Sequence, residues 1–75
     1  MISVTVTLFP PLRENRFAKA TIEIAEPATV KSLLEHLDIE LRNVESLYIN
    51  SKEAGFDHAL ADGDKISLLP FMGGG

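Results

Sequence analysis

The 75-residue chain contains no cysteine, and that absence removes several kinds of chemistry. Disulfide bonds, thiolate nucleophiles and zinc sites held by thiolates all require cysteine, as does a persulfide carried by the chain itself. Basic residues are also scarce, because 7 Lys and Arg stand against 11 Asp and Glu and the net charge is −4. Nucleic-acid binding depends on clustered basic side chains, so we expect no nucleic-acid partner.

Long apolar runs are missing as well. No stretch approaches the ~20 apolar residues that cross a bilayer, and the first residues lack the basic region and apolar core of a secretory signal. We therefore expect no membrane association and a cytoplasmic location. With 45% hydrophobic and 24% charged residues, the composition is typical of a folded domain. The length predicts one small domain with a thin core, too small for a deep catalytic pocket.

Alternating apolar and polar residues predict two strands at the start of the chain. The first is expected over residues 2–8 and the second over 18–24, each with β-branched residues. Pro10 and Pro11 end the first strand, because proline lacks the N–H that a sheet needs. The polar connection between the two strands then predicts an antiparallel hairpin.

One amphipathic helix is expected after the hairpin. Thr29 has the side chain of an N-cap, and the apolar residues from Val30 to Leu37 recur at the spacing of one helical face. Because only one stripe of the helix is apolar, we expect the helix to lie across one face of the sheet.

The remaining residues predict shorter strands. The apolar pattern weakens over 38–47, and a short strand is expected at 48–50. The sequence Asp-Gly-Asp at 62–64 predicts a turn, since glycine reaches positive φ and aspartate bonds nearby amides. A last strand follows over 65–70. This order of elements predicts an α+β sheet with its helix on one face.

Side chains suited to catalysis are few and scattered. His36 and His58 lie in different predicted elements without the spacing of metal ligands, so solvated or packing roles are favoured and no metal site is expected. The serines fit no nucleophile motif. The glutamates are spread over many elements, which favours a solvated surface over an acid–base pair. Asp62 and Asp64 lack the other oxygen ligands of a calcium loop, so a structural turn is favoured.

The end of the chain is the remaining candidate site. We expect a single domain over 1–72 and a flexible glycine tail over 73–75. One interpretation is a frayed end without function. The other is that the terminal carboxylate of Gly75 is the reacting group. Three extended residues reach at most about 10 Å, enough to enter a narrow channel in another protein, and glycine lets the backbone approach a partner closely.

Three stretches of the sequence resemble one known family. Leu12-Arg13-Glu14 follows the first strand. The middle stretch consists of 49–50 followed by 56–66, which contains the Asp-Gly-Asp turn. The last stretch, 68–75, reads Leu-Leu-Pro-Phe-Met-Gly-Gly-Gly. Together they are similar to the MoaD/ThiS-type ubiquitin-like sulfur carriers, most of all to the small subunit of molybdopterin synthase. The resemblance covers nearly the whole chain. It implies a β-grasp fold, with a mixed sheet of four to five strands and one main helix.

The resemblance also implies that the chain is a carrier and not an enzyme. A ubiquitin-activating-type adenylyltransferase would use ATP and magnesium to adenylate the Gly75 carboxylate. A sulfurtransferase or cysteine desulfurase would then leave a thiocarboxylate on Gly75, and a synthase large subunit would use the sulfur, with molybdopterin or tungstopterin synthesis favoured. Gly73 and Gly74 would thread into the partner, and the chain itself would bind no cofactor.

Residues just before the glycines are expected to bind partners. Alternation along the last strand turns Leu69 outward, and Pro70, Phe71 and Met72 follow it. For Phe71 a second possibility stays open, in which its ring folds back to close the core.

Three alternative functions also stay open. In the first, the chain would carry sulfur for thiazole synthesis, cysteine synthesis or transfer-RNA thiolation. In the second, it would be a protein modifier that forms isopeptide bonds through Gly75. In the third, it would be an interaction module with inert glycines.

Overall fold

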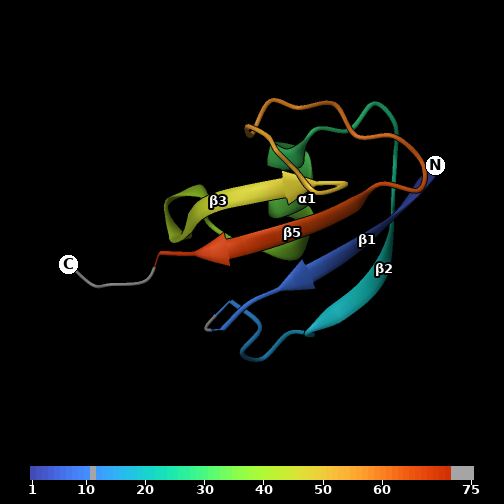
Figure 1. Ribbon diagram of the computed structural model, residues 1–75. Helices are drawn as coiled ribbons and strands as arrows, with labels where there is room; N and C mark the ends of the chain where they lie inside the picture. The colour runs from blue at the N-terminus through green and yellow to red at the C-terminus, as the bar shows by residue number, and fades with distance from the viewer. Residues whose placement is uncertain (11, 72–75) are drawn as a thin grey trace.

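The computed structural model describes residues 1–10 and 12–71, and within them five strands form one sheet. The elements in chain order are β1 (Ile2–Leu8), β2 (Lys19–Ile24), α1 (Val30–Leu37), a short 3-10 helix η1 (Leu41–Asn43), β3 (Val44–Ile49), β4 (Lys52–Glu53) and β5 (Lys65–Pro70). The strand order is β2-β1-β5-β3-β4, and α1 lies behind the sheet in the view of Figure 1. β1 and β5 are parallel and the other pairs are antiparallel, which confirms the expected mixed α+β sheet.

The core lies between one face of this sheet and the apolar stripe of α1. Val30, Leu33 and Leu34 of the helix are completely buried. The sheet contributes the buried residues of its three central strands: Ile2, Val4, Val6 and Leu8 of β1, Ile66 and Leu68 of β5, and Val44, Leu47 and Ile49 of β3. Burying a leucine side chain contributes roughly 2–3 kcal/mol, so this interface is the main source of stability in so small a domain.

The strand predicted at 48–50 is wrong in its bounds, because β3 begins four residues earlier, at Val44. Its pairing with β5 shifts register between Val44 and Ser46, which is a β-bulge. A bulge adds one residue to one strand and breaks the period of two. Val44 and Leu47 are both buried on the helix side with two residues between them. Because a regular strand has only one residue between such positions, the start of β3 could not be recognised from alternation. The bounds predicted for the second strand, 18–24, differ by one residue from those of β2, which begins at Lys19.

The N-terminus of α1 is capped as predicted and is crossed by a later segment. The Thr29 side chain accepts a hydrogen bond from the Ser32 amide at 3.3 Å, and the Ser32 hydroxyl accepts one from the Thr29 amide at 2.8 Å. The next two amides, of Val30 and Lys31, donate to the carbonyls of His58 and Phe56. Amides at a helix start have no partner within the helix, so this crossing satisfies them. No helix among the described residues is long and apolar enough to span a membrane.

The Asp62-Gly63-Asp64 turn ties the start of β5 to β1, as a structural turn should. Gly63 has φ +88°, a region that favours glycine. Its amide donates to the Ser3 carbonyl at 2.7 Å, and the Asp62 carboxylate accepts from the Ser3 amide at 2.7 Å. Asp64 accepts from the Asn50 side-chain amide at 2.9 Å. The carboxylates are therefore engaged with N–H donors, and the turn sets where β5 begins.

Candidate functional site

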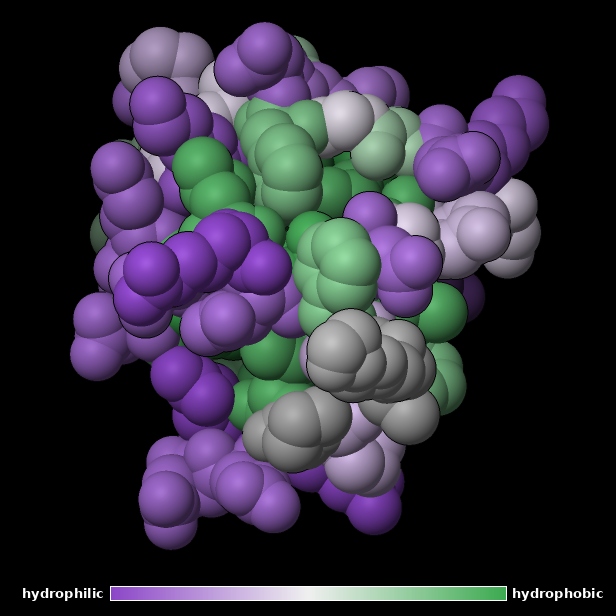
Figure 2. Space-filling model, turned by 90° about the vertical axis from the view of Figure 1, so that its left-hand side faces the viewer, coloured by the Kyte–Doolittle hydropathy of each residue, from purple (hydrophilic) through white to green (hydrophobic). Residues whose placement is uncertain are grey.

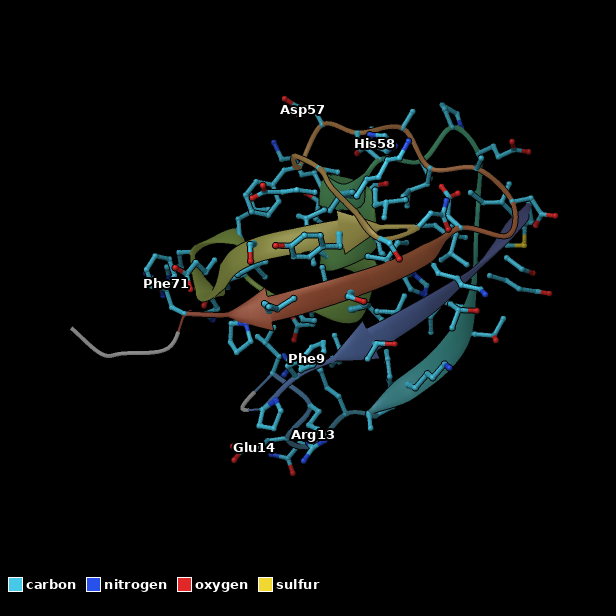
Figure 3. The ribbon with its side chains drawn as sticks, viewed as in Figure 1. Phe9, Arg13, Glu14, Asp57, His58 and Phe71 are labelled. Atoms are coloured by element: carbon cyan, nitrogen blue, oxygen red, sulfur yellow. The ribbon has the colours of Figure 1, made fainter. Side chains whose placement is uncertain are left out.

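The polar residues singled out in the sequence do not converge on one centre. Figure 3 shows Arg13 and Glu14 in the loop after β1, far from Asp57 and His58 in the segment that crosses α1. All four side chains are exposed, and so is His36. Among the described residues, no three His, Cys, Asp or Glu side chains form a group that could hold a metal ion. The remaining candidate site among the described residues lies at the end of β5.

Alternation along β5 places its last residues on different faces. Leu68 is buried against the helix, whereas Leu69 is half-buried on the opposite face, as expected. Pro70 is buried and pairs with Val44. Phe71 is 66% exposed, so of its two predicted positions the outward one is found and its ring does not close the core. Met72 and Gly73, Gly74 and Gly75, also expected in the site, lie outside the described residues.

An apolar groove lies beside the end of β5. Its volume is about 270 Å³, and Phe9, Pro10, Glu45, Leu69 and Pro70 line it. Figure 2, which looks onto this end of the molecule, shows apolar surface with hydrophilic side chains around it. An exposed apolar surface with a polar surround is typical of a protein-binding site.

The sequence prediction missed Phe9, which is 42% exposed and forms one wall of this groove. The parallel register pairs Leu8 with Leu68, and the Phe9 amide donates to the Leu68 carbonyl at 3.3 Å. This pairing places the end of β1 beside the end of β5. One local signal was present, because Phe9 directly follows Leu8 and so breaks the alternation of the first strand.

Charged residues of opposite sign lie near the end of β5. Glu45, the extra residue of the β-bulge, is exposed and lines the groove. Arg16 lies with Phe71 on the wall of a second cavity of about 300 Å³. The Arg16 guanidinium donates to the carbonyls of Leu12 at 3.0 Å and Asp38 at 2.9 Å. Because Asp38 caps the C-terminus of α1, the cation also interacts favourably with the helix dipole.

A mixed five-stranded sheet with one helix across its face is the fold of the ubiquitin-like β-grasp proteins. Three solved structures of comparable size support this assignment. SAMP1 from Haloferax volcanii is 26% identical with a TM-score of 0.76, and the match covers 97% of this chain and 99% of that one. A chain in the complex of subunits 1 and 2 of molybdopterin-converting factor from Helicobacter pylori is 28% identical with a TM-score of 0.67, and the match covers 99% of this chain and 100% of that one. The thiamine biosynthesis protein ThiS from Geobacter metallireducens is 27% identical with a TM-score of 0.58, and the match covers 95% of this chain and 99% of that one.

The family assignment rests on the sequence. The model of the ThiS family matches residues 6–75, so the chain belongs to the ThiS family. No curated protein matches the chain in sequence. The family resemblance and the β-grasp fold predicted from the sequence are thereby confirmed, and the protein is a ThiS/MoaD-like sulfur carrier or a ubiquitin-like small modifier.

Proposed function

We propose that this protein is a sulfur carrier whose Gly75 carboxylate is adenylated and then converted to a thiocarboxylate. The observation that carries the proposal is that the ThiS-family match runs through Gly75 itself. A terminal carboxylate is ionised at neutral pH and is an oxygen nucleophile. It attacks ATP bound by the partner, pyrophosphate leaves, and an acyl-adenylate forms. The outer persulfide sulfur of a second partner then attacks the carbonyl carbon and AMP leaves, which gives an acyl persulfide. A thiol of that partner cleaves the S–S bond, so that the thiocarboxylate stays on Gly75 and a disulfide forms on the partner.

In this proposal the chemistry of activation belongs to the partners. ATP and magnesium are used by a ubiquitin-activating-type adenylyltransferase, and the sulfur comes from a sulfurtransferase or cysteine desulfurase. The carrier contributes a reactive end and a docking surface, and it binds no cofactor of its own. The absence of cysteine is compatible with this role, because the sulfur is held on a backbone carboxyl and not on a thiol.

We propose molybdopterin or tungstopterin synthesis as the pathway, with a synthase large subunit as the final partner. Support comes from the Helicobacter pylori relative, whose structure is a complex of subunits 1 and 2 of molybdopterin-converting factor. The match to it covers 99% of this chain. The groove beside β5 supplies an apolar surface of the kind that the centre of such an interface needs.

Protein modification through Gly75 is the second candidate function. The likeness to SAMP1, a small archaeal modifier protein, at 26% identity and a TM-score of 0.76 favours it. Both functions begin with the same adenylate. They differ in the nucleophile that follows, which is sulfur for a carrier and a lysine amine for a modifier.

Intact-mass measurement separates these functions. The full chain is incubated with its activating enzyme, ATP, magnesium and a sulfur donor, and a parallel reaction omits ATP. We expect an ATP-dependent mass increase equal to the replacement of one oxygen by sulfur, located on Gly75 by fragmentation. ATP-dependent conjugates to lysine would instead identify a modifier. An unchanged mass, with an enzyme verified to adenylate another carrier, would contradict both functions.

Truncating Phe9 tests the groove as the docking surface. We expect Phe9→Ala to weaken binding to the activating enzyme roughly tenfold, because aromatic residues at the centre of an interface often contribute more than 1 kcal/mol. Isothermal titration calorimetry measures the affinity. The matched control is Leu41→Ala, since Leu41 is 37% exposed but does not line the groove. Equal affinities for Phe9→Ala and the unmodified chain would exclude the groove from this contact.

A further inference from the structure

β2 forms an edge of the sheet, and its register shows which backbone groups face outward. The Leu8 amide donates to the Ala18 carbonyl at 2.8 Å. In an antiparallel pair such bonded positions recur at every second residue, so Ala20, Ile22 and Ile24 direct their N–H and C=O groups toward β1. The groups of Lys19, Thr21 and Glu23 point the other way, and no described strand pairs with that side of β2.

The β1 side confirms this alternation. Thr5 lies opposite Thr21 in the register, and the Thr5 amide donates to the Asp64 carbonyl at 2.9 Å, away from β2. Because the N–H of Thr5 points away from β2, Thr5 and Thr21 are an opposite pair without hydrogen bonds between them. The N–H and C=O groups of Thr21 therefore point away from β1 as well.

The side chains along this edge are complementary to a second copy of themselves. Residues 19–23 read Lys-Ala-Thr-Ile-Glu, with opposite charges placed symmetrically about Thr21. If two β2 strands meet in antiparallel fashion around a two-fold axis at Thr21, each Lys19 lies opposite Glu23 of the second copy. An edge with charges of one sign would repel such a partner. Lys19 and Glu23 are exposed, and neither makes an ion pair within the described residues.

The apolar side of β2 is also incompletely covered. Ala20 and Ile22 face the helix side, yet both remain half-buried, whereas the matching residues of β1 are buried. Figure 1 shows the reason, because α1 lies behind β3 and β5 while β2 lies at the margin of the sheet. In the antiparallel pair, Ile22 would pack beside Ala20 of the second copy and lose more of its exposed surface.

We propose that β2 is a self-association edge, through which two copies of this chain form a symmetric dimer with one continuous sheet. Thr21 with Thr21, and Lys19 with Glu23 in both directions, become hydrogen-bonded pairs of the new ladder. The strand directions reverse between the copies, so the two β5 strands end at opposite sides of the dimer. The grooves around Phe9 and Leu69 therefore stay accessible, and this association is independent of the function proposed above.

Charge reversal at the edge tests the dimer. Because only residues 19–23 of each copy pair, we expect an interface below the ~800 Å² per partner of a stable complex. We therefore expect a weak dimer with a dissociation constant of about 0.1–1 mM, measured by sedimentation equilibrium. Lys19→Glu and Glu23→Lys each place like charges opposite one another twice in the dimer. Each is expected to raise the dissociation constant roughly tenfold. Lys52→Glu is the matched control, because Lys52 is exposed on β4, at the opposite edge of the sheet.

Mixing the two variants gives the decisive result. Lys19→Glu and Glu23→Lys chains are complementary to each other at both charged positions, so an equimolar mixture is expected to recover the dimer that each lacks alone. In parallel, amide exchange of Lys19, Thr21 and Glu23 should slow as concentration rises, while that of Ala20 stays unchanged. A chain that remains monomeric at about 1 mM, or a dimer indifferent to these reversals, would overturn the proposal.

Discussion

Removing Gly75 is expected to abolish adenylation and thiocarboxylate formation while leaving the domain folded. The shortened chain still ends in two glycines, Gly73 and Gly74, so it keeps the chemistry of its end and loses only length. One extended residue spans about 3.5 Å. A misplacement of 1 Å at a reacting group costs about 100-fold in rate, so a carboxylate held back by a whole residue should react at least 100-fold more slowly. Pyrophosphate release measures the rate.

Two comparisons separate tail length from folding in this experiment. Thermal unfolding of the truncated chain should match that of the full chain, because the buried core lies within the described residues up to Leu68. A chain with one glycine added after Gly75 should also lose activity, since its carboxylate overshoots. If the truncated chain were adenylated as fast as the full one, Gly75 would not be the reacting residue.

Leu68→Ala is expected to destabilise the protein by about 3 kcal/mol, the usual cost of a cavity left by a buried leucine. Leu68 is completely buried on β5, between Leu8 of β1 and Leu47 of β3. A domain of this length has a total stability of only roughly 4–11 kcal/mol. The variant should therefore lose a large share of it, seen in urea unfolding as a lower midpoint with a similar slope.

The neighbouring residue supplies the matched control. Leu69→Ala makes the same change one position later, on the face away from the helix where Leu69 is half-buried. We expect it to cost about 1 kcal/mol of stability, but to weaken binding to the activating enzyme as Phe9→Ala does. Equal destabilisation by the two variants would contradict the face assignments of β5.

Where local patterns are strong, the sequence predicted the elements to the residue. The first and last strands were expected over 2–8 and 65–70, which are the bounds of β1 and β5. The Thr29 cap and the start of α1 at Val30 were also correct. Alternation and helical spacing are local, so they can be read without knowing what lies opposite. The start of β3 was missed because its bulge breaks the alternation. The strand β4 was missed because two residues carry no period.

The sequence by itself determined the proposed chemistry. None of the 75 residues is cysteine, and the ThiS-family match extends to Gly75, whose carboxylate is the proposed reacting group. Only the tertiary structure decided what surrounds the end of β5. The groove needs Phe9 from the end of β1 and Leu69 from the end of β5, and the bulge adds Glu45. These residues meet because β1, near the start of the sequence, pairs in parallel with β5, near its end. A contact between segments so far apart in the sequence depends on packing that no local pattern encodes.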